Sequence, residues 1–246
     1  MRVVVVGATG LIGSRTVARL RDHGVEAVPV SRATGVDVTT GEGLDEALRG
    51  VEVVVDVTDA PSRAERASVD FFDTAAGRLL PAAAAAGAEH YLALSVVGTD
   101  RVPGGYFRAK ALQEQRVRRS PIPHSVVRAT PFYESVDALS RSTVYADGVH
   151  VAPALVRPVS TADVAAAVAH AAVGVPLFGV LEVAGPEQFR LDELTAKVQA
   201  ANGDPRGVIT DPNAPFFGAV PDERALLPGT DAHLGRTTLD QWLAQR

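Results

Sequence analysis

The sequence predicts an α/β protein, a doubly wound parallel sheet of the Rossmann type with a small C-terminal substrate lobe. Short β-branched runs alternate with helical patterns along the first 130 residues, as in βαβ units. The valine run at residues 3–6 lacks polar alternation, which is typical of strands covered by helices on both faces, and residues 51–57 form another valine run. A glycine-rich turn directly follows the first run. We therefore expect one domain over residues 1–246, with its core in 1–130 and mostly lobe, with the remaining sheet elements, in 131–246.

The first half of the chain reads as a regular series of elements. Runs rich in valine, leucine and alanine predict strands at residues 3–6, 25–30, 51–57, 90–95 and 124–128. Helical patterns between them, such as the one that turns Val17 and Leu20 inward, predict helices at 14–22, 43–49, 63–86 and 106–119.

The pattern weakens after residue 130. Residues 161–172 and 191–202 predict helices, the second ended by Gly203, and residues 178–184 predict a strand. Residues 204–228 are rich in proline and glycine, so we expect a loop with at most short elements there. A short helix at 238–244 closes the chain.

Composition excludes several classes of function. The chain carries 24 basic and 29 acidic residues, a formal charge of −5, so no basic field favours nucleic acid. It has no cysteine, which excludes disulfides and thiol catalysis, and the spacing of its six histidines offers no local metal pair. We expect no metal, no signal peptide and no membrane segment, hence a cytoplasmic protein. Arginine supplies all but two of the basic residues, which suggests a GC-rich bacterial source.

The most specific motif is the turn Gly7-Ala-Thr-Gly10-Leu-Ile-Gly13, between the first strand and the first helix. Gly7 allows the tight turn, Gly10 lets the backbone approach a pyrophosphate, and Gly13 permits close packing of helix on strand. The free amides of this stretch face the anion, so we expect Thr9, Leu11 and Ile12 to contact it as well. This strand–turn–helix setting predicts a dinucleotide site.

The end of the second strand favours NADP over NAD. NAD-selective sites place a carboxylate there for the ribose 2′-hydroxyl, whereas this chain has Ser31 and Arg32. A guanidinium and a hydroxyl can bind a 2′-phosphate, which a carboxylate would repel. Arg15, just past the glycine turn, is a second candidate for the same phosphate.

Tyr106 and Lys110 form the second signal. Four residues apart on a helix, the phenol and the ammonium share one face. A nearby ammonium favours phenolate, so we expect Lys110 to lower the pKa of Tyr106 toward a range useful for proton transfer. Ser95 stands at the end of its strand, where open α/β sheets bind ligands.

In these residues the chain resembles the short-chain dehydrogenase/reductase superfamily, in its atypical, NmrA-like NAD(P)H-binding branch. The likeness covers nearly the whole chain, and five segments carry it: Leu94-Ser95-Val96-Val97-Gly98, Tyr106-Phe-Arg-Ala-Lys110, Val127-Arg128-Ala129-Thr130-Pro131-Phe132, Val183-Ala184-Gly185-Pro186-Glu187 and Trp242-Leu243-Ala244. The family has a Rossmann core and a small C-terminal substrate lobe. It includes NADPH-dependent reductases of quinones and other small molecules, and also redox sensors without catalysis.

The resemblance implies a role for each candidate residue. Ser95 would orient a substrate oxygen, Tyr106 would donate the proton, and Lys110 would hold the nicotinamide ribose. Further cofactor contacts are implied for Thr58 and for the pairs Asp37-Val38 and Pro131-Phe132. Thr58-Asp59-Ala60 replaces the asparagine-rich segment of typical members, which is one departure from the family pattern.

These observations predict an enzyme that reduces a small carbonyl or quinone with hydride from NADPH. A non-catalytic NADP(H)-sensing regulator is the alternative from another class, and an epimerase or dehydratase that retains its cofactor is a third interpretation. We expect a small-molecule substrate, no nucleic acid and no membrane partner. The identity of the substrate, the direction of the reaction and the choice between monomer and homodimer stay open at this point.

Overall fold

A parallel sheet of seven strands forms the centre of the computed structural model, which describes residues 1–142 and 144–245. Residues 143 and 246, both within the predicted 131–246 lobe, lie outside the described residues. The spatial order is β12-β9-β5-β4-β3-β1-β2, and every neighbouring pair is parallel. The strands are β1 (Arg2–Val6), β2 (Glu26–Val30), β3 (Val53–Asp56), β4 (His90–Val96), β5 (His124–Ala129), β9 (Val180–Ala184) and β12 (His233–Leu234). The predicted Rossmann-type fold is confirmed.

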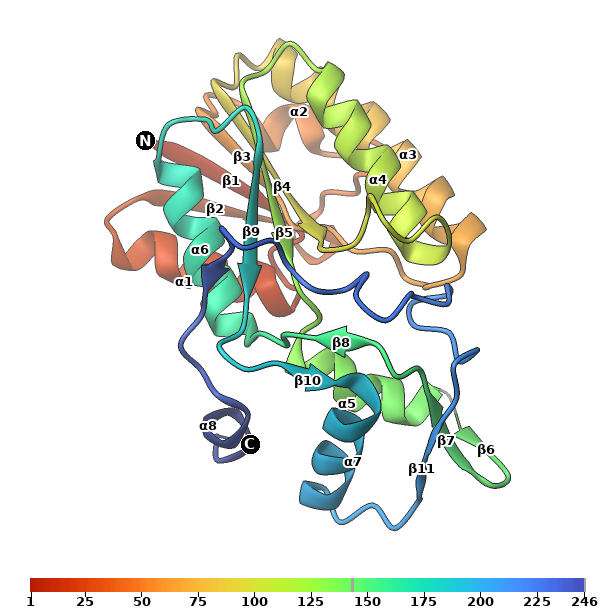
Figure 1. The fold of residues 1–246 in the computed structure, drawn as a ribbon. Helices are drawn as coiled ribbons and strands as arrows, with labels where there is room; N and C mark the ends of the chain where they lie inside the picture. The colour runs from red at the N-terminus through yellow and green to blue at the C-terminus, as the bar shows by residue number, and fades with distance from the viewer. Residues whose placement is uncertain (143, 246) are drawn as a thin grey trace.

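Helices cover both faces of this sheet (Figure 1). On one face, α1 (Leu11–Asp22) packs beside α6 (Thr161–Val173). On the other, α3 (Glu65–Ala85) packs beside α4 (Gly105–Arg119), and the short α2 (Leu44–Ala47) also contacts α3. The valines of β1 and β3 are accordingly buried throughout, which explains why those strands lack polar alternation.

A smaller group of elements lies beyond the carboxyl end of the sheet (Figure 1). It contains two small sheets, β10 with β8 and β11-β7-β6. Its elements are α5 (Tyr133–Ser142), β6 (Val144–Tyr145), β7 (Gly148–Val151), β8 (Leu155–Val156), β10 (Phe189–Arg190), α7 (Leu191–Ala201) and β11 (Val208–Thr210), with α8 (Leu239–Leu243) near the C-terminus. Between them the chain returns to the main sheet for α6, β9 and β12.

The register of the strands places the candidate site at one edge. Val6 of β1 pairs with Val30 of β2 and with Asp56 of β3, so the residues that follow these strands meet at the carboxyl edge. In the sheet, β2 lies on one side of β1 and β3 lies on the other, so the chain passes across β1 between them. This reversal is the switch point where open α/β sheets form a ligand crevice.

The structure corrects two boundaries and adds a helix. Helix α1 begins at Leu11, inside the glycine turn, where we expected a start at residue 14. Helix α5 was not predicted, because its short amphipathic pattern follows the Thr130-Pro131 turn without a cap signal. Strand β9 begins at Val180 instead of residue 178, because Phe178 adopts a left-handed backbone with φ of 48° and is 68% exposed. Among the described helices, none has the length and apolar content needed to cross a membrane.

Candidate functional site

The glycine turn has the shape of an anion cradle. Gly7 has φ of 88°, and a Cβ there would lie 2.7 Å from the carbonyl oxygen of Val57. A Cβ on Gly13 would lie 2.2 Å from the carbonyl oxygen of Gly7, closer than any side chain permits. Gly10 caps α1 without a side-chain hydrogen bond, and the first turn holds no acidic residue. The amides of Gly7, Ala8 and Gly10 donate within the chain, so the amides that fit the pyrophosphate of a dinucleotide are those of the first turn of α1.

The end of β2 lies directly beside this turn. The amides of Gly7 and Ala8 both donate to the carbonyl oxygen of Val30, at 2.9 and 3.1 Å. Ser31 and Arg32 therefore follow β2 at the rim of the cradle, and Arg32 is exposed in the single turn of 3₁₀ helix over Arg32–Thr34. Their position fits the role predicted for them, which is to bind the 2′-phosphate. Arg15, by contrast, donates to the carbonyl oxygen of Leu11 at 3.2 Å.

Two of the predicted cofactor contacts already have partners within the chain. Asp37 accepts hydrogen bonds from the amide and hydroxyl of Thr39, at 2.7 and 2.6 Å, and these bonds hold the pKa of Asp37 below its usual value. The amide and hydroxyl of Thr58 donate to the buried Asp56, at 3.0 and 2.7 Å. Val38 is half-buried and packs against the core beneath the sheet edge.

A cavity of about 200 Å³, called the central cavity below, opens beside the cradle. It brings together nine of the residues predicted from the sequence: Gly10, Leu11, Ile12, Thr58, Ser95, Tyr106, Lys110, Pro131 and Phe132. The other predicted residues do not line it: Gly7, Thr9, Gly13, Ser31, Arg32, Asp37 and Val38. Sequence reasoning missed further lining residues: Val57, Asp59, Arg63, Leu94, Val96, Ala129, Thr130 and Ser135. Phe217 also lines the cavity, whereas its neighbour Phe216 is fully buried.

Tyr106, at the start of α4, has a different partner from the one expected. Its hydroxyl donates to the Asp59 carboxylate at 2.8 Å, and the Arg63 guanidinium lies 4.3 Å from the centre of its ring. Burial and the Asp59 carboxylate raise the pKa of Tyr106 well above its usual value. The expectation that Lys110 lowers this pKa is therefore wrong in this structure, because the nearest charge to the hydroxyl is negative.

Lys110 is buried one helical turn further along α4. Its ammonium donates to Gln113 and lies 4.2 Å from the centre of the Phe72 ring. Burial lowers the pKa of Lys110 to about 8, although the carboxylates of Asp56, Asp59 and Glu114 act in the opposite direction. The site thus holds a cation that sits at the cavity wall and loses its proton close to neutral pH.

Replacing Lys110 by methionine is expected to stabilise the fold. A lysine whose pKa is about 8 instead of 10.5 opposes folding at neutral pH by about 3 kcal/mol. Methionine removes this penalty but also the bond to Gln113, so we expect a gain of roughly 2 kcal/mol in urea unfolding at pH 7. The unfolded chain binds the extra proton between pH 8 and 10.5, so the gain shrinks as the pH rises through that window.

The chain supplies a matched control for this measurement. Lys197, its one other lysine, is exposed on α7, and Lys197→Met should change the stability by less than about 0.5 kcal/mol. A Lys110→Met protein that is less stable than the parent at pH 7 would contradict the account of the buried ammonium.

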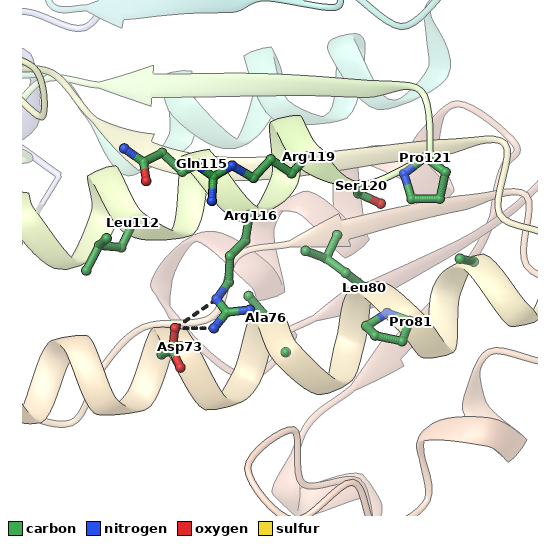
Figure 2. Close-up of a pocket in the computed structure, with 12 residues that line it drawn as sticks. Asp73, Ala76, Leu80, Pro81, Leu112, Gln115, Arg116, Arg119, Ser120 and Pro121 are labelled. Atoms are coloured by element: carbon green, nitrogen blue, oxygen red, sulfur yellow. Dashed lines mark hydrogen bonds and ion pairs between the residues drawn. The ribbon is translucent and has the colours of Figure 1, made fainter.

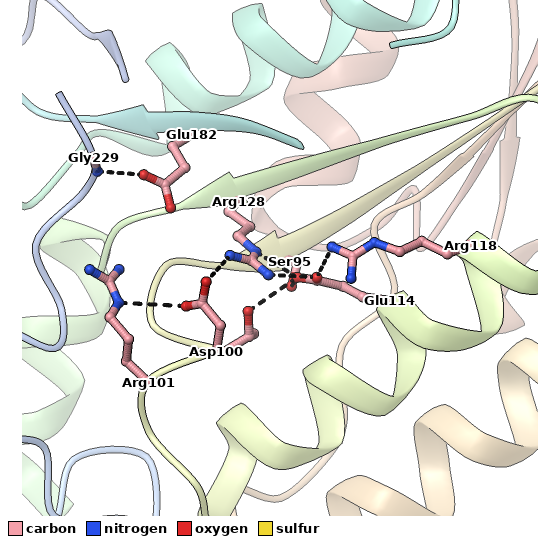
Figure 3. A network of polar contacts seen from close by, with 9 residues as sticks. Ser95, Asp100, Arg101, Glu114, Arg118, Arg128, Glu182 and Gly229 are labelled. Carbon is pink, nitrogen blue, oxygen red and sulfur yellow. Dashed lines mark hydrogen bonds and ion pairs between the residues drawn. The ribbon is translucent and has the colours of Figure 1, made fainter. Parts of the chain in front are cut away.

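Ser95 belongs to a buried polar network on the α4 side of the sheet (Figure 3). Its hydroxyl donates to Glu114 at 2.6 Å, and Thr99 donates to the same oxygen at 3.3 Å. Arg128 grips both carboxylate oxygens of Glu114, at 2.9 and 2.8 Å. Burial alone would raise the pKa of Glu114, but the hydrogen bonds from Arg128 and Ser95 hold it below its usual value. Because the Ser95 hydroxyl already donates to Glu114, it faces other groups in this structure as a hydrogen-bond acceptor.

The larger hollow on the described part of the molecule lies elsewhere. It measures about 700 Å³ and runs between α3 and α4 (Figure 2). Asp73 and Arg116 form an ion pair across it. None of its lining residues is among those predicted for the site, so we assign the chemistry to the central cavity.

The fold and the cradle together define a dinucleotide-binding α/β protein. A family model described as NAD(P)H-binding matches residues 7–173. The chain is also 31% identical over 226 residues to a (4-alkanoyl-5-oxo-2,5-dihydrofuran-3-yl)methyl phosphate reductase of Streptomyces griseus subsp. griseus, an alignment that covers 82% of this chain and 74% of the relative. The chain belongs to the NAD(P)H-binding family.

Solved structures agree with this fold at low sequence identity. The Thermus thermophilus UDP-glucose 4-epimerase in complex with NAD superimposes with a TM-score of 0.73 at 20% identity, covering 93% of this chain and 90% of that one. The NADPH complex of the Escherichia coli quinone oxidoreductase QOR2 gives a TM-score of 0.64 at 21% identity, covering 85% and 77%. These similarities bear on the fold alone.

Proposed function

We propose that this protein is an NADPH-dependent oxidoreductase that reduces a small carbonyl or quinone, with Tyr106 as the proton donor. The observation that carries the proposal is the arrangement of the central cavity. Its wall joins the first turn of α1, after the glycine cradle, to the Tyr106 phenol and the Lys110 ammonium. Bound NADPH would supply the hydride. The chain would supply the proton of Tyr106, the positive charge of Lys110 and a cavity that encloses the substrate.

Each part of the chain has a defined task in this proposal. The stretch Gly7–Gly13, with Thr9, Leu11 and Ile12, holds the pyrophosphate, and Ser31 with Arg32 holds the 2′-phosphate. Val38 packs against the adenine, and the Asp37 turn shapes that end of the site. Lys110 binds the nicotinamide ribose, while Thr58, Pro131 and Phe132 border the nicotinamide. Tyr106 keeps its proton until the substrate oxygen gains negative charge, and Ser95, at the cavity wall, orients that oxygen once its hydroxyl turns from Glu114.

The proposed substrate class has two supports. The relative from Streptomyces griseus is named as a reductase of a methyl phosphate whose dihydrofuran ring carries an oxo and an alkanoyl group, so its named substrate is a small phosphate ester with carbonyl groups. The wall of the central cavity is mainly apolar, with Phe132 and Phe217 among its residues. We infer that residues 131–246 act mostly as the substrate lobe, because Ser135 of α5 and Phe217 reach the cavity from that part of the chain.

Removal of the Arg32 side chain should weaken NADPH binding selectively. A bidentate, charge-assisted contact to a phosphate contributes about 1.5–3 kcal/mol, so Arg32→Ala should raise the Kd for NADPH by at least about tenfold. The Kd for NADH, which lacks the 2′-phosphate, should stay the same. Fluorescence titration with both nucleotides measures the two effects, and Arg19→Ala, an exposed arginine at the other end of α1, is the control. An equal loss for both nucleotides would overturn the assignment.

A turnover assay tests the proposed function itself. NADPH consumption is followed by its absorbance with a panel of acceptors, beginning with quinones and continuing with small enones and ketones. Turnover with at least one acceptor supports the oxidoreductase. Tight NADPH binding without turnover on the whole panel would support the sensing regulator, and nucleotide that stays bound through purification would support an epimerase or dehydratase.

A further inference from the structure

Asp59 lines the central cavity but has no role in the function proposed above. It follows β3 in the Thr58-Asp59-Ala60 segment. Its side chain stays 52% exposed and lines the same cavity as Tyr106. An acid at this point is the closest charged group to the predicted proton donor.

Arg63 fixes the Asp59 carboxylate in one orientation. Two parallel bonds of 2.7 Å join the guanidinium to the two carboxylate oxygens, a geometry that is rigid as well as strong. The guanidinium plane is held in turn by two rings, with centres 4.3 Å away for Tyr106 and 5.2 Å for Phe217. The carboxylate therefore cannot turn away from the phenol without breaking both bonds to Arg63.

The shared oxygen connects this ion pair to Tyr106. Oδ1 of Asp59 accepts one bond from Arg63 and one from the Tyr106 hydroxyl, at 2.7 and 2.8 Å. The phenolic proton consequently points at Asp59 in this structure. Because the hydrogen bonds and charge of Arg63 keep the pKa of Asp59 below its usual value despite desolvation, the acceptor is ionised at neutral pH.

Resting on the proposed function, we propose that Asp59 is a positioning residue that orients the Tyr106 hydroxyl and keeps it protonated until a substrate oxygen accepts the proton. When hydride reaches the substrate, the oxygen gains negative charge and becomes a stronger base than the carboxylate. The hydroxyl then turns from Asp59 to that oxygen, the O–H bond of Tyr106 breaks as the new O–H bond forms, and solvent reprotonates the phenolate. Arg63 supports the arrangement by holding Asp59.

The test follows the ionisation of Tyr106 directly. The chain has four tyrosines, so ¹³Cζ-tyrosine labelling gives few signals, and Tyr106→Phe identifies the one of interest. In the parent protein the Tyr106 signal should titrate above the midpoint near 10 of a free tyrosine. In Asp59→Asn, which keeps the size but not the charge, the midpoint should fall by at least about one pH unit.

Asp73→Asn is the matched control. Asp73 is 53% exposed and pairs with an arginine, Arg116, but lies in the hollow between α3 and α4 (Figure 2). This variant should leave the Tyr106 midpoint unchanged. If Asp59→Asn does not give the circular dichroism spectrum of the folded parent, Asp59→Ser replaces it. A Tyr106 midpoint that does not move in the folded variant, or one at or below about 10 in the parent, would overturn the proposal.

Activity adds a second readout. Asp59→Asn should lower kcat by about tenfold while the Kd for NADPH stays within about twofold, because the variant disturbs the proton donor and not the cradle. Unchanged kcat would contradict the positioning role. If the parent turns nothing over, the proposed function fails, but the titration still decides whether Asp59 controls Tyr106.

Discussion

Replacing Tyr106 by phenylalanine should lower kcat by about 10²–10⁴-fold, the range for loss of a general acid. The substitution removes one oxygen from a buried ring that packs edge-on against Phe72 and Phe217, with centres 5.7 Å away in both cases. Phenylalanine keeps these contacts, so the cavity should keep its shape. Steady-state kinetics with NADPH and the best acceptor measures the loss, and fluorescence titration should give a Kd for NADPH within about twofold of the parent.

The control for this substitution is Tyr145→Phe. Tyr145 is 57% exposed in β6 and lines no part of the central cavity, so its loss should leave kcat unchanged. A Tyr106→Phe protein that keeps more than about a tenth of the parent rate would show that solvent or another group supplies the proton.

Replacing Glu114 by glutamine should cost about 3–5 kcal/mol of stability, the range for breaking a buried ion pair. Glu114 is 1% exposed and Arg128 is 7% exposed, so the variant leaves a buried guanidinium without its main counter-charge. Asp100, which is 57% exposed and binds one nitrogen of Arg128 at 3.0 Å (Figure 3), compensates in part only. Urea unfolding followed by circular dichroism measures the loss.

The same substitution on the surface provides the comparison. Glu46 of α2 pairs with Arg49, which lies just beyond the helix, and the two side chains are 73% and 74% exposed. Glu46→Gln should change stability by less than about 0.5 kcal/mol. Equal effects of the two substitutions would contradict the view that the network of Glu114 and Arg128 fastens α4 to β5.

Local spacing determined the parts of the site that could be predicted from the sequence. The three glycines of the turn lie within seven residues, and a Cβ at Gly13 would indeed collide with the carbonyl of Gly7. Tyr106 and Lys110 share a face of α4 because four residues make about one helical turn. Glu114 lies four residues after Lys110 and therefore on the same face of α4. The sequence contained this signal, but we did not use it.

Partners that are distant in sequence could not be predicted in this way. Asp59 lies 47 residues before Tyr106 in a loop without periodicity, so only the fold brings the two together. The pKa of Tyr106 was predicted in the wrong direction because burial and the Asp59 carboxylate raise it, whereas helical spacing indicated only the charge of Lys110. The i, i+4 pair of Asp59 with Arg63 was the one local hint.

The second half of the chain was harder to predict for a similar reason. Strands β6, β8 and β10 have two residues each, too few for an alternating pattern. Helix α5 and strand β7 are short elements stabilised by the lobe they build together. Phe217 reaches the central cavity from a stretch with φ of 52°, a conformation that no pattern of hydrophobic residues indicates.

Fluorescence titration of the purified protein with NADPH, and in parallel with NADH, tests the central claim most directly. We expect saturable binding of NADPH that is tighter than that of NADH, because the cradle at Gly7–Gly13 holds the pyrophosphate and Arg32 holds the 2′-phosphate. Equal affinities would leave the cradle in place and remove Arg32 from the account. If neither nucleotide bound, the glycine turn would serve the fold alone, and the proposed oxidoreductase would be contradicted.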